Sequence, residues 1–369
     1  MSVIEVNQMD KPLSQRNGKV DLLKFLFSVT VAIYHFNATV EYPNEILNTA
    51  YIAVEFFFMV SGYFMAKSLS KFENRKNIDV LKESLIFMKK KYFSIFPYHV
   101  YAYVLTIALW IPYFELSIKS WLIKVFNSIP SFFLLKMFGF NISSWLMAEW
   151  YLSSMLIVMF ILTPIIIKYR KLFTYYFAPI LSLAFIAVVF KKCHTLNVFV
   201  LKDNLVWLGN IRAFAEIAIG CIIYEVTEKG IFDKLDRKVL MLAEFTCYLI
   251  TFLYIFKDYE LSLEPSVFFI LTLGVALTFD KKTSVKFLNN KFVSFLGKFS
   301  LAVYLCHPAA RYCTTKNEWI YGGYYSQMII FLIYTFLISL TCILAVDLLK
   351  KNFSRTTSAG NTNTINKQI

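Results

Sequence analysis

The chain has 369 residues, of which 58% are hydrophobic and 17% are charged, and its mean hydropathy is +0.56. A soluble domain of this length would not carry so much apolar sequence, and here the apolar residues fall in long, separated runs. The net charge of +14 would suit a nucleic-acid partner, but no basic patch interleaved with aromatic residues supports that function. Composition therefore argues against a soluble enzyme and against a nucleic-acid-binding protein, and it favours an all-α polytopic membrane protein.

Ten stretches are long and apolar enough to cross a lipid bilayer as helices. They are 20–41, 50–67, 93–114, 148–167, 172–190, 205–226, 239–256, 265–280, 292–311 and 326–349. If both termini are cytoplasmic, most of the 38 Lys and Arg residues lie in or beside cytoplasmic segments, which is the positive-inside distribution. We therefore predict a cytoplasmic N-terminal segment (1–19), a transmembrane domain (20–350) and a disordered cytoplasmic tail (351–369).

Two of the connecting segments are unusual. The longest cytoplasmic loop, 68–92, is dense in charge, and its middle, 79–91, is typical of an amphipathic helix lying at the membrane interface. The longest outer segment, 115–147, is too apolar for a free loop and too interrupted for a span. We predict that it is interfacial, or that it re-enters the bundle where protein or a water-filled cavity shields its backbone.

The first span carries His35 eleven residues after Lys24, which places the imidazole about 16 Å from the cytoplasmic end at ~1.5 Å per residue. The second span runs the other way, and Glu55 lies twelve residues before Lys67, about 18 Å from the same face. An ionisable side chain in a span is costly, so each is a functional candidate. Their matched depth predicts that Glu55 orients His35, and that His35 acts as a general base.

Structural roles remain alternatives for these residues. A single intramembrane histidine is often a hydrogen-bond partner between helices, and Glu55 could belong to a structural ion pair. Ser61 and Gly62, one to two turns after Glu55, are more typical of a close helix crossing than of a nucleophile. The sequence leaves these readings open.

Further polar residues fall at a similar depth in later spans. Arg212 and Glu216 share a helix face as an i, i+4 pair, and they suit either a structural pair or a substrate clamp. His307 lies in the ninth span, and Trp150 and Tyr151 lie where an aromatic belt would anchor the fourth. Several helices each bringing one ionisable group to mid-membrane indicate a polar cavity in the bundle.

Motifs of several other enzyme classes are missing. The chain has no GxSxG elbow, no P-loop and no GxGxxG fingerprint. Its six cysteines show no zinc spacing, so we expect no metal site. The sequence shows no inverted repeat and no paired broken helices, which are features of transporters and flippases. A transporter or flippase stays an alternative function.

Four stretches carry a more specific signal because they occur together and in order. They are RNGKVDLLKFLFSVTVAIYH (16–35), AVEFFFMVSGYFMAKS (53–68), EWYL (149–152) and FLGKFSLAVYLCHP (295–308). Together with the helix NIRAFAEIAIGCIIYE (210–225), they resemble the acyltransferase-3 family of integral membrane acyltransferases. The chain resembles the stand-alone kind, which lacks an SGNH-type hydrolase domain.

The resemblance implies an O-acetyltransferase of the bacterial cytoplasmic (inner) membrane. Such an enzyme moves an acyl group, commonly acetyl, from cytoplasmic acetyl-CoA to a hydroxyl of a surface polysaccharide or its lipid-linked precursor. A small-molecule acceptor is the alternative. His35 and Glu55 would be catalytic, and either direct attack or an acyl-histidine intermediate is compatible with the sequence.

The resemblance also implies binding residues, with two departures from the family pattern. The expected donor-binding residues are Lys24, Lys90, Lys91 and Arg212, and the expected acceptor-binding residues are Trp150, Tyr151 and His307. Lys24 stands where the family usually has Arg, and KYFS (91–94) stands where it has R-x-x-R. Lysine keeps the charge but loses the bidentate fork of arginine.

Overall fold

The structure is a computed structural model that describes residues 16–38, 40, 46–110, 117–139, 145–146, 148–198, 207–257, 261–315 and 323–365, the side chains of 110, 315 and 353–365 aside. The principal helices are α1 (Gly18–Asn37), α2 (Ala53–Leu69), α3 (Val80–Trp110), α4 (Ile118–Asn127), α5 (Ile129–Phe132), α6 (Glu149–Leu172), α7 (Ala178–Cys193), α8 (Leu208–Glu228), α9 (Arg237–Lys257), α10 (Glu264–Phe279), α11 (Lys291–Thr315) and α12 (Tyr324–Ile365). The described residues contain no strand, which confirms the predicted all-α class.

Eight helical segments of the described chain are long and apolar enough to cross a membrane, so the protein is a multi-pass membrane protein. The difference from the ten predicted spans has two sources. Two predicted spans fall in one helical run, Glu149–Cys193, which is interrupted by non-helical geometry at Tyr169 (φ −129°, ψ 34°) and by a π-helical stretch, Phe173–Phe177. The predicted span 205–226 coincides with α8, whose buried charged residues lower its hydropathy.

Helix ends also differ from the predictions in two places. The expected interfacial helix 79–91 is not a separate element, because α3 continues from Val80 to Trp110 and includes Pro97 in its interior. Proline is tolerated in membrane helices where neighbouring groups satisfy the freed backbone. At the other end of the chain, α12 continues as helical backbone to Ile365, past residue 351 where the sequence predicts a disordered tail. Extending an established helix is far less costly than starting one.

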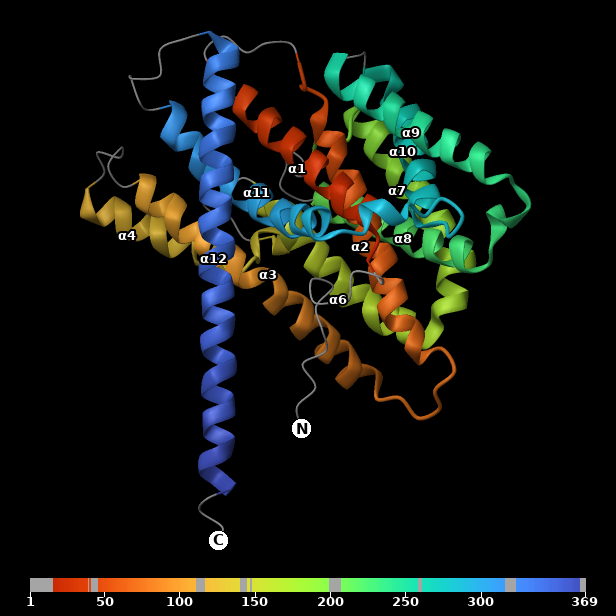
Figure 1. Cartoon of the computed structure of the whole chain (residues 1–369), viewed down its shortest axis with the longest axis horizontal. Helices are drawn as coiled ribbons and strands as arrows, with labels where there is room; N and C mark the ends of the chain where they lie inside the picture. The colour runs from red at the N-terminus through yellow and green to blue at the C-terminus, as the bar shows by residue number, and fades with distance from the viewer. Residues whose placement is uncertain are drawn as a thin grey trace.

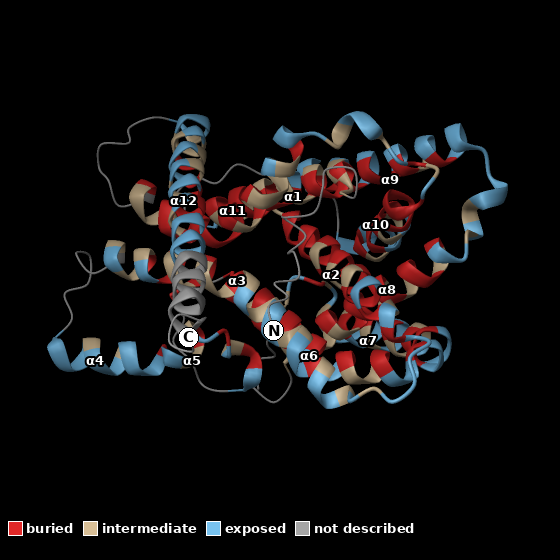
Figure 2. Cartoon of the chain, turned by 60° about the horizontal axis from the view of Figure 1, so that its bottom comes forward, coloured by how far each residue is buried: buried red, intermediate tan, exposed pale blue. Residues whose placement is uncertain are grey.

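The core lies between helices that are distant in sequence (Figure 1). Helix α1 packs along α11, α2 along α8, and α11 also along α12. Buried residues concentrate on these central helices, whereas α4 and one side of α12 are exposed (Figure 2). Such an exposed apolar side is expected of helices that face lipid. We call the end of the bundle at which α1, α3 and α11 begin the inner end, after the orientation that the charges predict.

Two glycines allow α2 and α8 to approach closely. A Cβ atom on Gly62 would collide with the backbone carbonyl of Ile217 on α8, and one on Gly220 would collide with the carbonyl of Met59 on α2. The close-packing reading of Gly62 is therefore the one that the structure favours. Small residues at such crossings bring backbones together in membrane bundles, and this crossing holds the outer half of α2 against α8.

The segment that follows α3 folds back along it. The Tyr103 hydroxyl donates to the Ser128 carbonyl (2.9 Å), and the Tyr92 hydroxyl donates to the Phe133 carbonyl (3.5 Å). Deeper in the core, Nε2 of His99 lies 3.2 Å from the Ser131 carbonyl. These contacts run along α3, as expected of a segment that re-enters the bundle.

Candidate functional site

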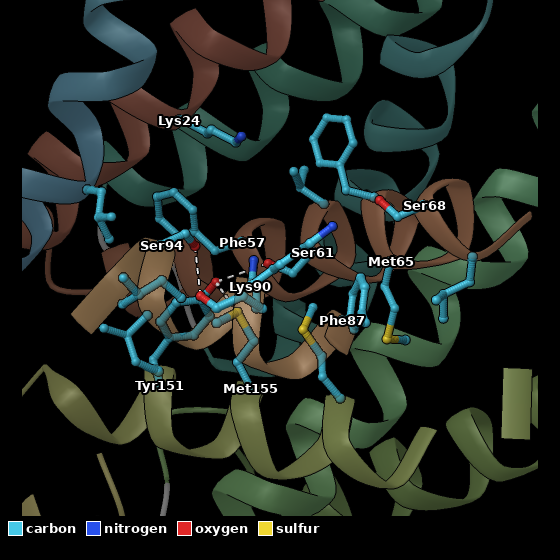
Figure 3. A pocket seen from close by; sticks show the side chains of 18 of the residues that line it. Lys24, Phe57, Ser61, Met65, Ser68, Phe87, Lys90, Ser94, Tyr151 and Met155 are labelled. Carbon is cyan, nitrogen blue, oxygen red and sulfur yellow. Dashed lines mark hydrogen bonds between the residues drawn. The ribbon is translucent and has the colours of Figure 1, made fainter. Parts of the chain in front are cut away.

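A cavity of about 380 Å³ lies in the inner half of the bundle, between α1, α2, α3, α6 and α11 (Figure 3). Its charged lining residues are Lys24, Lys71, Lys90, Lys91, Lys298 and Glu83. Five cations against one carboxylate give the cavity a strongly positive character in a low-dielectric setting, where charges act most strongly. Its remaining walls are mostly aromatic and aliphatic, so an occupant with an anionic part and an apolar part fits this lining best.

Two of these lysines face the cavity without an acidic partner. Lys24 on α1 lies with its ammonium 5.1 Å from the Phe64 ring, and Lys91 comes from α3. The charge of Lys24 acts on Lys91, and neither lysine forms an ion pair with a described residue. Lys298 differs, because its ammonium lies 2.5 Å from a carboxylate oxygen of Asp347 on α12. Lys24 and Lys91 therefore form a pair of positive charges that an anionic ligand would neutralise.

Hydroxyl groups and aromatic rings close the far end of the cavity. The hydroxyls of Ser61 and Tyr151 are 3.4 Å apart, and both residues line the cavity. The Tyr304 hydroxyl donates to the carbonyl of Ala148 (2.9 Å), while its ring centroid lies 5.5 Å from that of Tyr151 and 6.0 Å from that of Phe57. These three rings separate the cavity from the outer half of the bundle.

Beyond that layer two histidines lie side by side. The ring centroids of His35 on α1 and His307 on α11 are 5.0 Å apart, and the His307 ring lies 6.1 Å from that of Tyr304. Nδ1 of His307 lies 3.3 Å from the Val303 carbonyl, and its Nε2 is buried without a hydrogen-bond partner among the described residues. The charge of Arg311, one turn further along α11, acts on both imidazoles. Neither histidine lines the cavity.

The predicted pairing of Glu55 with His35 is not present in the structure. Glu55 accepts a hydrogen bond from the Arg212 guanidinium, whose Nε lies 3.8 Å from a Glu216 oxygen. The same guanidinium donates to the Val198 carbonyl (2.8 Å) and lies 5.2 Å from the centroid of the Trp150 ring. The prediction failed because equal depth on two helices does not fix which faces meet. The close α2–α8 crossing presents Glu55 to α8 instead.

The structure thus divides the predicted site residues into three groups. Lys24, Lys90, Lys91 and Tyr151 line one cavity, and His307 joins His35. Arg212, Glu55 and Trp150 form a separate contact outside the cavity lining. The aromatic-belt reading does not describe Tyr151, which is 6% exposed.

Sequence reasoning missed three residues of this region. Tyr304 and Arg311 flank His307 at i−3 and i+4, so they share its helix face, and this spacing could have identified them. Lys71 lines the cavity from the 3-10 helix Ser70–Phe72 that follows α2.

Comparison with known proteins gives a family. A family model described as an acyltransferase domain matches residues 17–348, which include every helix from α1 to most of α12. No curated protein and no solved structure matches the chain. The matched range contains the whole cavity and both histidines.

Proposed function

This chain belongs to the acyltransferase family whose model it matches, and we propose that it is a membrane-embedded O-acetyltransferase. In this proposal acetyl-CoA enters from the cytoplasmic side, and the acceptor is a hydroxyl of a bacterial surface polysaccharide or of its lipid-linked precursor. The membrane is the bacterial cytoplasmic (inner) membrane, with the inner end of the bundle facing the cytoplasm. The charge distribution along the chain supports that orientation.

One observation carries the proposal. A lysine-lined cavity at the inner end is separated by a single aromatic layer from the paired imidazoles of His35 and His307, of which His307 is fully buried. Coenzyme A combines phosphate groups with a long, less polar arm that ends in the thioester. The lysines suit the phosphates, and the apolar walls suit the arm. The imidazoles suit the proton transfer that acyl transfer to a hydroxyl requires.

The lysines divide the work of holding the donor in this proposal. Lys24 and Lys91, which have no acidic partner among the described residues, neutralise phosphate within the cavity. Lys90 and the exposed Lys71 add positive charge along the lining and attract the anion from solution. Because a lysine ammonium acts as a point charge, it needs no particular orientation of the phosphate oxygens. Arg212 is not part of this group, since it lies outside the lining and binds Glu55.

His35 and His307 supply the base. The acceptor oxygen attacks the carbonyl carbon of the thioester, the hydroxyl proton passes to an imidazole nitrogen, and the carbon–sulfur bond breaks to release coenzyme A. His307 takes the orienting role that the sequence assigned to Glu55, because its ionisable ring lies 5.0 Å from that of His35. Tyr304 lies between the cavity and this pair. Transfer therefore requires either movement of the Tyr304 ring or an acyl-histidine that carries the acyl group past it.

The test compares surface glycans by mass spectrometry and NMR from strains with the wild-type gene, with a deletion, and with His35→Ala or His307→Ala at matched membrane abundance. The proposal expects the deletion to remove an acetyl-sized mass increment and both substitutions to do the same. If the deletion removes the increment but His35→Ala keeps it, the proposed base is wrong. If the deletion changes no glycan, the proposed acceptor is overturned.

A further inference from the structure

We propose that the hydroxyl groups of Ser61 and Tyr151 form the binding site for the carbonyl oxygen of the donor's acyl group. This inference rests on the proposed function, since it assumes that an acyl thioester occupies the cavity. With this site at the far end of the cavity, the protein would distinguish acetyl-CoA from free coenzyme A.

The two hydroxyls converge from different helices at the end of the cavity (Figure 3). Ser61 comes from α2 and Tyr151 from α6, and their oxygens are 3.4 Å apart. The other neighbour of the Tyr151 hydroxyl is the Met155 sulfur at 3.7 Å. A strong hydroxyl hydrogen bond measures about 2.7–2.8 Å, so both contacts are long and the sulfur is a poor acceptor. A ligand oxygen placed between them would gain two better hydrogen bonds than the pair now makes.

Other hydroxyls of the same cavity are committed to backbone carbonyls. Ser94 donates to the Lys91 carbonyl (2.7 Å), Ser300 to the Gly297 carbonyl (3.0 Å) and Tyr304 to the Ala148 carbonyl (2.9 Å). These protons are held at ordinary hydrogen-bond distances. Apart from the exposed Ser68, Ser61 and Tyr151 are therefore the lining hydroxyls of the described chain that are not held by a backbone carbonyl.

The chemistry of the site suits a carbonyl oxygen better than a thiol. Phe57, Leu152 and Met155 line the cavity around the pair, so a hydrogen bond formed there is poorly screened by water. A thioester carbonyl accepts two hydrogen bonds, and negative charge grows on its oxygen as the carbon is attacked. Free coenzyme A presents a thiol, which is a weak acceptor. The lysines bind the phosphates of both molecules alike, so the hydroxyl pair is what separates them.

The experiment measures binding of acetyl-CoA and of coenzyme A to the purified full-length protein in lipid nanodiscs, for the wild type, Tyr151→Phe, Ser61→Ala and the control Ser300→Ala. The wild type is expected to bind acetyl-CoA more tightly than coenzyme A. Each of the first two substitutions is expected to weaken acetyl-CoA binding about three- to tenfold, the usual effect of one lost hydrogen bond, and to leave coenzyme A binding unchanged. Ser300→Ala changes neither.

Two outcomes overturn the inference while leaving the proposed donor intact. In one, Tyr151→Phe and Ser61→Ala keep the preference for acetyl-CoA. In the other, they weaken both ligands equally, which indicates a structural role. If the wild type binds neither ligand, the proposed donor itself is wrong and the inference falls with it. The three results are distinguishable because the wild type is measured with both ligands.

Discussion

Two regions of this bundle bury ionisable side chains in opposite ways. Around the α2–α8 crossing, the guanidinium of Arg212 (2% exposed) lies against the carboxylates of Glu55 and Glu216, both fully buried. Around the cavity and the histidine pair, Lys24, Lys91 and His35 form no ion pair among the described residues. In the first region the cation lies against carboxylates of its own and a neighbouring helix, whereas the second region is left open to a ligand.

This difference shows that an intramembrane charge alone does not reveal whether its role is structural or functional. Burying a charge is costly in either region, so cost alone marks both as functional candidates. The presence or absence of an ion-pair partner distinguishes a structural charge from one that could bind a ligand. Elsewhere Lys19 pairs with Glu244 (2.8 Å) and Arg170 with Glu225 (2.5 Å), and these pairs also tie together helices distant in sequence. The buried charges paired across helices hold the fold together, whereas Lys24 and Lys91, which form no ion pair among the described residues, line the cavity.

The largest effect should follow from breaking the neutralised region. Replacing Arg212 with methionine leaves two buried carboxylates without their cation, and removing one partner of a buried ion pair typically costs about 3–5 kcal/mol. We therefore expect Arg212→Met to lower the unfolding temperature strongly, or to prevent accumulation in the membrane. Thermal unfolding of the purified protein, followed by size-exclusion fluorescence, measures this.

Lys24→Met is the matched control, because it also removes a cation from inside the bundle but breaks no ion pair among the described residues. It should leave the unfolding temperature unchanged or raise it. An unfolding temperature that falls as far for Lys24→Met as for Arg212→Met would erase the distinction between the two regions.

A second effect should appear in ligand binding instead of stability. Lys24→Gln removes one of the two unpaired ammonium groups, and a charge-assisted hydrogen bond is worth about 1.5–3 kcal/mol. We expect acetyl-CoA to bind roughly ten- to a hundredfold more weakly, with a smaller dependence on salt than in the wild type. Isothermal titration at two salt concentrations measures both quantities. Unchanged affinity in low salt would mean that Lys24 does not meet the ligand's phosphates.

The sequence predicted the helical bundle because a run of apolar residues long enough to span a bilayer has few alternative structures. It also predicted that polar groups from several helices gather at mid-membrane. Of the groups it named, His307 meets His35, and Arg212 meets Glu55 and Glu216 in a separate contact. Helical rise alone was sufficient to place these groups along each helix.

The sequence did not predict how each helix is rotated about its axis, and so which of its faces meets which neighbour. Glu55 lies at the depth of His35 but points to Arg212, because the close crossing at Gly62 turns that face of α2 toward α8. The same limitation hid Tyr304, whose importance depends on the rings that surround it. Facing directions are set by packing against neighbours that are distant in sequence, and one sequence without its structure does not record them.

A third prediction tests that crossing directly. A methyl group at Gly62 would press on the Ile217 backbone, which does not move aside easily, and overpacking usually costs about 1–3 kcal/mol. Gly62→Ala should lower the unfolding temperature, whereas Gly323→Ala should have almost no effect because no atom lies within 4 Å of its added carbon. Equal stability of the two variants would show that the Arg212 ion pair is positioned without the close crossing.

The smallest effect concerns Lys298, a cavity lysine that forms an ion pair with Asp347. Asp347 is half exposed, and its ion pair with Lys298 should contribute no more than about 1 kcal/mol to stability. Asp347→Asn should therefore leave the unfolding temperature nearly unchanged. Because it removes the carboxylate that offsets the charge of Lys298 in the cavity lining, it should also tighten acetyl-CoA binding slightly, most clearly in low salt. A weaker affinity in Asp347→Asn would instead mean that the ion pair holds α11 and α12 in the arrangement that shapes the cavity, so that even this exposed pair belongs with the structural charges.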